Sequence, residues 1–286
     1  MNGRRTLGDT SPTGELSGPA GLGAAVRLPG GWTGRLLLVV AVVSLVSFAT
    51  QVARYGFHQQ FPGLNSLERW FFVDLEMGVP AWLSASLLFL AGERLWRVGT
   101  AAQAHGSPWS RHWRVLAVVF VYLSLDELTE IHEQVIRPVK ALLHLSGALA
   151  FAWVVVAVPL LVVFAVVFSG FLLALPRWTR WAFVISAACY VGGAVAVEMV
   201  GAALAEQTGV VTTVVTIAGG VRTVTETLAI PTVTYGVVVG VEEALEMVGT
   251  VLFLGAVTVA LADVDTQLSQ PTVAPGRSAA PADGDR

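Results

Sequence analysis

The sequence predicts an all-α protein, a polytopic bundle of six transmembrane helices. Hydrophobic residues make up 55% of the 286 residues, charged residues only 13%, and the mean hydropathy is +0.69. This composition is typical of integral membrane proteins. The formal net charge of −3 offers no basic surface for nucleic acid. We therefore expect the lipid bilayer, and no nucleic acid, as the partner of this chain.

Apolar segments follow one another over most of the chain, and each is long enough to cross the hydrocarbon core of a bilayer. The six predicted helices cover approximately Arg35–Val52, Phe71–Trp96, Trp113–Val135, Leu145–Leu175, Trp181–Leu204 and Pro231–Ala262. They define a transmembrane domain over residues 32–262. Residues 1–31 and the Pro-, Ala- and Asp-rich residues 263–286 are predicted to be disordered cytoplasmic tails.

The loop between the fifth and sixth helices has a different pattern. Residues Gly209–Thr227 are rich in Val and Thr, which alternate around Gly219-Gly220. Alternation about a Gly-Gly pair predicts a short β-hairpin that lies over the outer face of the bundle.

The distribution of Lys and Arg predicts how the bundle is oriented. With the N-terminus inside, twelve of the 17 basic residues fall on the cytoplasmic side and five fall outside. Basic residues concentrate on the cytoplasmic side of inner membranes. Several tryptophans, among them Trp32, Trp96 and Trp181, fall at the same inner boundary, as an aromatic belt would. The pattern predicts a multi-pass protein of the bacterial cytoplasmic membrane, with both termini in the cytoplasm.

Acidic residues interrupt three of the apolar segments. Inserting one charged residue at the centre of a membrane helix costs roughly 2.5–3.5 kcal/mol, so such residues indicate function. The third helix carries a histidine among its acids, and the fifth and sixth carry acids only. The residues are Asp126, Glu127, Glu130, His132 and Glu133 in the third helix, Glu198 in the fifth, and Glu242, Glu243 and Glu246 in the sixth.

These three groups of acids are predicted to lie at one depth. The third and fifth helices run outward, with eleven and sixteen uncharged residues before their first acid, and the sixth runs inward with sixteen after Glu246. At a rise of 1.5 Å per residue, every group lies about 17–25 Å above the inner boundary. The acids therefore converge on the outer half of the bilayer.

Helical spacing also assigns the acids of the third helix to faces. Asp126, Glu130 and Glu133 are spaced i, i+4, i+7 and share one face. His132 points about 100° away from Glu133, so it joins the acids only if the helix is surrounded or distorted there.

No Lys or Arg lies within these apolar segments beside the acids, so an internal network of ion pairs is excluded by composition. The carboxyl groups must be protonated, open to outside water or neutralised by bound cations. Oxygen-rich ligation favours a divalent ion such as Mn²⁺, Mg²⁺, Ca²⁺ or Fe²⁺ over copper or zinc. The nine residues named above are the candidate ligands, and no catalytic residue can be assigned.

Three functions remain open. The acids could form a metal site, in a protein that is either an enzyme activating water or polarising a substrate from the outer leaflet, or a binding protein. They could instead titrate during proton- or cation-coupled transport, although that needs a water path through inner thirds that are apolar. The third alternative is a structural or assembly subunit of the membrane.

At these residues the chain resembles an uncharacterised group of six-helix bacterial integral membrane proteins, to which no activity is attached. The resemblance spans residues 70–255 but is carried by short stretches: 74–84, 122–133, 198–201 and 242–249. It implies the same six-helix topology and an acidic site, and adds no substrate or reaction. The group is expected to have Asn where this chain has Gly78, which leaves open the part that the second helix has in the site.

Overall fold

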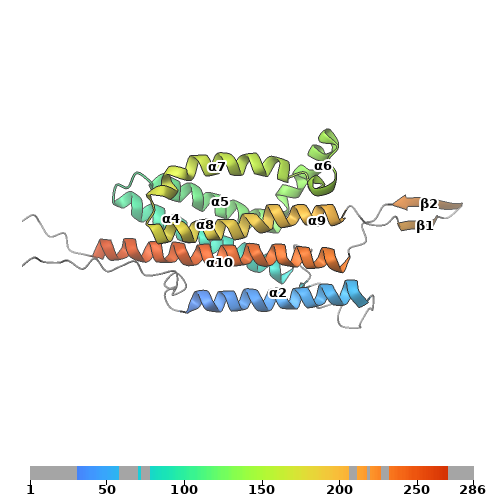
Figure 1. Cartoon of the computed structure of the whole chain (residues 1–286), viewed down its shortest axis with the longest axis horizontal. Helices are drawn as coiled ribbons and strands as arrows, with labels where there is room; N and C mark the ends of the chain where they lie inside the picture. Colours follow the sequence, from blue (N-terminus) through green and yellow to red (C-terminus); the bar gives the residue numbers. More distant parts are fainter. Residues whose placement is uncertain are drawn as a thin grey trace, which may run out of the picture.

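The computed structural model describes residues 31–57, 70–71, 78–205, 211–217, 220–226 and 232–269, and the statements below concern these residues. It is a bundle of helices that run along one long axis (Figure 1). The elements are α2 (Trp32–Phe57), α4 (Val79–Ala104), α5 (Ser110–Thr129), α6 (Ile131–Leu143), η1 (Gly147–Leu149), α7 (Val154–Ala174), α8 (Arg177–Val191), η2 (Gly192–Val197), α9 (Glu198–Ala205), β1 (Val211–Ile217), β2 (Gly220–Glu226) and α10 (Val233–Ser269).

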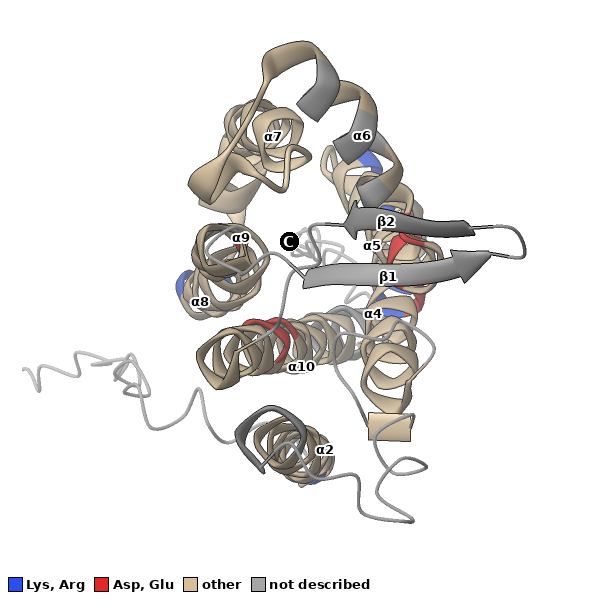
Figure 2. Ribbon diagram, turned by 90° about the vertical axis from the view of Figure 1, so that its right-hand side faces the viewer, with Lys and Arg blue, Asp and Glu red and all other residues tan. Residues whose placement is uncertain are grey.

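Helix α10 is the central element of the bundle. It packs against α2, α4, α8, η2 and α9, and viewed along the bundle it lies between α2 on one side and the α8–α9 pair on the other (Figure 2). More than half of its most apolar stretch is buried. A helix that is apolar around its whole circumference is stable only when it is covered by protein or lipid.

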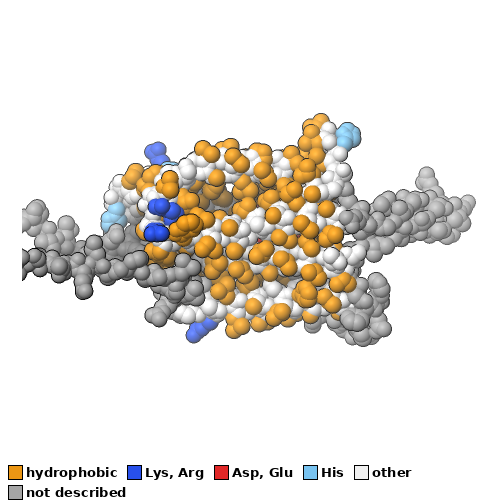
Figure 3. Space-filling view, viewed as in Figure 1, with side chains coloured by type: hydrophobic (Ala, Val, Ile, Leu, Met, Phe, Trp, Pro, Cys, Tyr) orange, Lys and Arg blue, Asp and Glu red, His pale blue; other side chains and the backbone are white. Residues whose placement is uncertain are grey.

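Four helical stretches of the described chain are long and apolar enough to cross a membrane: Trp32–Ala53, Val154–Ala174, Arg177–Ala205 and Val233–Ala262. Helices α4 and α5 belong to the same bundle but carry arginines and acids. Side chains on the outside of the bundle are largely apolar, and an orange band covers the middle of the face drawn in Figure 3. On that face the described Lys and Arg side chains gather at the left end. The helical, membrane-protein character of the predicted fold is thus confirmed.

Helices α4 and α5 approach each other closely because of two glycines. A Cβ atom on Gly92 would lie 2.9 Å from the side chain of Val121, and one on Gly99 would lie 2.9 Å from the side chain of Arg114. Ser124 of α5 also donates a hydrogen bond of 2.7 Å to the carbonyl of Ala85. Small residues and interhelical hydrogen bonds are the usual means of helix association in a membrane, where lipid removes most of the hydrophobic driving force.

The structure differs from the predicted segments at several places. The third segment is not one helix over Trp113–Val135, since α5 ends at Thr129 and α6 starts afresh at Ile131. Most of the first residues of the fourth segment form η1 and turns, and the fifth contains the π-helix η2. Helix α10 continues to Ser269, past the predicted boundary at residue 262. Apolar composition locates a span but does not reveal a change of helix type within it.

Strands β1 and β2 pair in antiparallel fashion beyond the end of the bundle where α10 begins (Figure 1). Val211 pairs with Glu226 at one end of the ladder and Ile217 with Gly220 at the other.

Candidate carboxylate site

A break between α5 and α6 brings His132 to Asp126. Glu130 is the residue at the break, with a left-handed backbone (φ 52°), and its N–H still donates to the carbonyl of Asp126. Beyond the break, the backbone N–H of His132 donates to Oδ1 of Asp126 (2.9 Å), and Nδ1 of His132 lies 2.9 Å from Oδ2. One residue thus engages both oxygens of one carboxylate.

This break corrects one sequence-based expectation and meets the condition attached to another. Asp126, Glu130 and Glu133 do not share one helical face, because Glu130 leaves the helix and Glu133 belongs to α6. His132 joins the acids through the kind of distortion that its helical position would have required. The side chain of Glu133 lies outside the described residues, so its predicted role stays a prediction.

Glu198 is held by a residue that the sequence-based reasoning did not select. The indole Nε1 of Trp153 donates to Oε1 of Glu198 at 2.6 Å. The Trp153 ring also meets the ring of His132 edge to face, with centroids 5.4 Å apart. Trp153 directly precedes α7, so these contacts join the ends of α5, α6, α7 and α9. An indole beside a strongly apolar helix was the only signal for it, and such residues are common at membrane interfaces.

Glu246 of α10 lies within electrostatic range of acids from three helices. The charges of Glu127, Glu198, Glu242 and Glu243 all act on it. Those residues come from α5, α9 and α10, and red segments lie on these three helices in Figure 2. The structure therefore brings together acids that are up to 119 positions apart in the sequence, between Glu127 and Glu246.

Two glycine contacts fix α10 against α8 and η2 at this level. A Cβ atom on Gly193 would lie 2.8 Å from the carbonyl oxygen of Glu242, and one on Gly249 would lie 2.7 Å from the backbone nitrogen of Tyr190. Because backbone meets backbone at both places, neither residue can be enlarged without moving a helix. The π-helix η2 contains Gly193 and ends directly before Glu198. Such wide turns occur frequently at functional sites.

Two uncharged polar side chains face the same acids. The Tyr190 side chain of α8 is within electrostatic range of Glu246, Glu127 and Glu243. The buried Ser84 of α4 faces the carboxyl group of Glu127. Tyr190 was missed by sequence reasoning, because a single tyrosine in an apolar helix carries no pattern.

A layer of aromatic rings lies on the arginine side of the acids. Phe120 of α5 stacks on Phe253 of α10 with centroids 4.5 Å apart, and Phe253 meets Phe183 of α8 at the same distance. Phe183 continues to Trp113 at 5.9 Å, and Trp113 continues to Phe171 of α7 at 4.9 Å. The rings join α5, α10, α8 and α7 between the acids and the arginine-rich end of the bundle.

The described residues include no group of three or more His, Cys, Asp or Glu side chains at metal-binding distance. The acids are near enough to act on one another electrostatically, but their carboxyl groups do not converge on one point. The ionisation of each acid therefore depends on its neighbours. To chelate one metal ion, the carboxyl groups would have to rotate toward each other.

A family model described as "Domain of unknown function (DUF8692)" matches residues 35–261. The chain belongs to the DUF8692 family. The match covers all nine candidate ligands, from Asp126 to Glu246, and agrees with the predicted resemblance to an uncharacterised family; the acidic pattern proposed for that group stays a prediction. No curated protein and no solved structure matches the chain.

Proposed function

We propose that this DUF8692 protein binds a cation, and most simply a divalent metal ion, in the outer half of a six-helix inner-membrane bundle. The observation that carries the proposal is the position of Glu246, on which the charges of four further glutamates act. The ligands come from the nine candidates, with Glu246 central and Glu127 and Glu198 contributed by other helices. Mn²⁺, Mg²⁺, Ca²⁺ or Fe²⁺ fits this oxygen-rich set.

Charge balance supports a bound cation. The apolar stretches that contain these acids hold no Lys or Arg, and ionised carboxyl groups at such a depth destabilise the folded protein unless something neutralises them. A cation would draw several carboxylates together and supply the missing charge. Rotation about the side-chain bonds of glutamate would have to bring oxygens from different helices to one ion.

The six-span topology with both termini in the cytoplasm is part of the proposal. It requires α4 and α5 to cross the membrane beside the four more apolar stretches. Their close mutual packing and their place within the bundle support this (Figure 2). The arginines at the end opposite to the acids would then face the cytoplasm.

The aromatic layer favours binding or catalysis over transport. A coupled transporter must open the acids to the cytoplasm in turn, and the contacting rings of Phe120, Phe253 and Phe183 lie between the acids and the arginine-rich end. A ligand that reaches the acids from the outer side needs no such opening. An enzyme of this kind would use the metal to activate water or polarise a substrate, with the Asp126–His132 pair beside it.

Elemental analysis of the detergent-purified protein tests the proposal. Protein prepared without chelators should contain a divalent metal in stoichiometric amount, and the Glu246→Gln variant should lose it while remaining folded. Glu93→Gln is the matched control, because Glu93 lies on α4 within an ion-pair cluster at the arginine-rich end. Absence of metal in the wild type, or equal loss in Glu93→Gln, would reject the metal site and leave protonated acids as the better explanation.

A further inference from the structure

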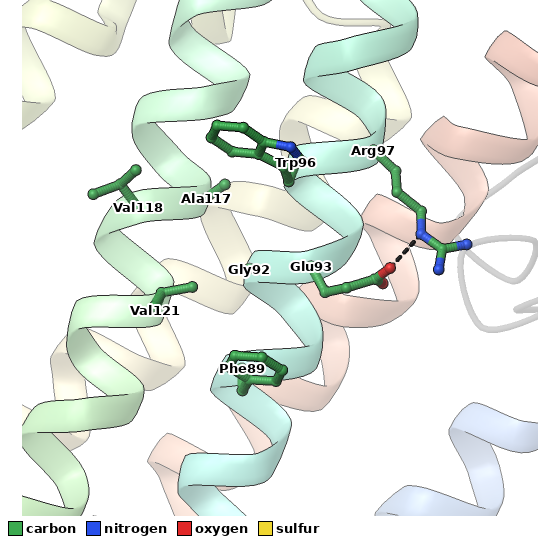
Figure 4. Close-up of a pocket in the computed structure, with 8 residues that line it drawn as sticks. All are labelled: Phe89, Gly92, Glu93, Trp96, Arg97, Ala117, Val118 and Val121. Carbon is green, nitrogen blue, oxygen red and sulfur yellow. Dashed lines mark hydrogen bonds and ion pairs between the residues drawn. The ribbon is translucent and has the colours of Figure 1, made fainter.

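A groove on the outside of the bundle lies between α4 and α5, and none of the nine candidate ligands lines it. It has a volume of about 510 Å³ and is open along its length. Gly92 and Ala117 line it at one of the two places where these helices are in close contact. Figure 4 shows Phe89 and Trp96 of α4 opposite Val118 and Val121 of α5.

Apart from Glu93 and Arg97, the residues that line this groove are apolar, and its large side chains face outward. Phe89 is 53% exposed, Trp96 51% and Val118 60%. Phe89 precedes Trp96 by seven residues, so the groove extends for about 10 Å along α4. Length, shape and lining fit a hydrocarbon chain that lies parallel to the helices.

Charged groups stand at one end of the groove. Arg97 forms an ion pair with Glu93, and Nε of Arg94 lies 3.4 Å from the same carboxyl group (Figure 4 shows the pair with Arg97). The guanidinium of Arg114 lies 5.5 Å from the centre of the Trp96 ring. Three arginines against one glutamate leave this end with an excess of positive charge.

We propose that the groove binds one anionic phospholipid from the leaflet at the arginine-rich end of the bundle. An acyl chain would lie between Phe89, Trp96 and the valines of α5. The phosphate would lie at Arg97 and Arg114, whose guanidinium groups bind phosphate oxygens through paired N–H donors. Basic pockets between transmembrane helices hold lipid headgroups in this way. The proposal is independent of the carboxylate site, since it uses none of its residues.

Brominated lipids test this inference, because bromine on an acyl chain quenches nearby tryptophan fluorescence. The protein is reconstituted into phosphatidylcholine vesicles that contain brominated phosphatidylglycerol or brominated phosphatidylcholine. The signal from Trp96 is the difference between the wild type and Trp96→Phe. Phosphatidylglycerol should quench Trp96 at a lower mole fraction than phosphatidylcholine does.

Two variants should remove that preference by different routes. Arg97→Gln/Arg114→Gln should weaken the selectivity for the anionic lipid about tenfold. Val118→Phe should fill the groove from an exposed position and reduce quenching by both lipids. The control Arg35→Gln/Arg177→Gln removes the same charge at the same end of the bundle, from α2 and α8, and should leave the selectivity unchanged.

Two results would overturn the proposal. Equal quenching of Trp96 by both lipids would show ordinary contact with bulk lipid. Equal loss of selectivity in Arg35→Gln/Arg177→Gln would show a general attraction of anionic lipid to the basic end of the protein, and no particular site at α4 and α5.

Discussion

Glu246 and Phe253 lie two turns apart on the same face of α10, so that the acid stands directly above the aromatic ring. The same interval of seven residues separates Glu127 from Phe120 on α5 and Tyr190 from Phe183 on α8. Seven residues correspond to about 10 Å along a helix. Three helices thus present a polar layer and, beneath it, a layer of contacting rings.

The two layers predict that the acids are reached from one side only. A cysteine introduced as Glu246→Cys in a Cys189→Ala background should react with a membrane-impermeant thiol reagent added on the side of the β1–β2 strands. The same reagent added on the arginine side should give no labelling, because the rings of Phe120, Phe183 and Phe253 block the path. Arg177→Cys, at the opposite end, is the control and should show the reverse pattern.

Opening the ring layer should change this result. In Glu246→Cys/Phe253→Ala the largest contact of the layer is lost, since Phe253 meets both Phe120 and Phe183. Labelling from the arginine side should then appear. If labelling stays confined to one side, other side chains form the barrier and the ring layer does not.

The contact of Asp126 with His132 predicts a coupled pair. The carboxylate is 13% exposed and the imidazole 32%, so water competes only partly for their hydrogen bonds. Asp126→Ala and His132→Ala should each lower the free energy of unfolding. The decrease in the double variant should be smaller than the sum of the two single decreases by about 1–2 kcal/mol. Denaturant unfolding in mixed micelles measures the coupling, and His144→Ala, at an exposed residue beyond α6, is the uncoupled control. Strict additivity would show that the two side chains do not interact.

The two contacts of Trp153, its ring on His132 and its N–H on Glu198, can be separated by substitution. Trp153→Phe keeps an aromatic ring beside His132 but removes the N–H that Glu198 accepts. It should lower the free energy of unfolding by about 0.6–2 kcal/mol, whereas Glu198→Gln, which retains an acceptor oxygen, should cost less. Thermal unfolding of both variants in the same detergent provides the comparison. A larger loss in Glu198→Gln would mean that the charge of Glu198, more than this hydrogen bond, stabilises the site.

The sequence predicted the parts of this site that depend on composition and on position along a helix. Hydropathy located the apolar helices, and the count of residues between the arginines and the acids placed Glu127, Glu198 and Glu246 at a similar depth. Both inferences need only a constant rise per residue. The structure brings these three acids within electrostatic range of one another.

The other contacts of the site depend on local backbone geometry and on helix packing, which composition does not encode. The left-handed turn at Glu130 joins His132 to Asp126, and no periodic pattern distinguishes Glu130 from a helical glutamate. The contact of Trp153 with Glu198 joins residues 45 positions apart through the placement of α7 and α9. Tyr190 takes its place in the site only after α8 has packed on α10.

The glycines of the α8–α10 contact predict which substitutions displace the acids. Gly249→Ala would place a methyl group 2.7 Å from the backbone nitrogen of Tyr190, and Gly193→Ala would place one 2.8 Å from the carbonyl of Glu242. Each should lower the free energy of unfolding by about 1–3 kcal/mol, as overpacking does. Gly240→Ala on the same helix is the control, since the nearest atom there is 3.8 Å away, on Phe48.

Gly240→Ala should be neutral or should stabilise the protein by up to about 1 kcal/mol, because alanine is the better helix former. Thermal unfolding of the three variants checks the order of stabilities. Gly193 of η2 packs against the turn that carries Glu242 and Glu246, and Gly249 follows that turn on α10. Their alanine variants should therefore also weaken any cation binding that depends on these acids. A Gly249→Ala protein as stable as Gly240→Ala would show that α8 and α10 can separate without cost, and that the acids of α10 are not fixed by this contact.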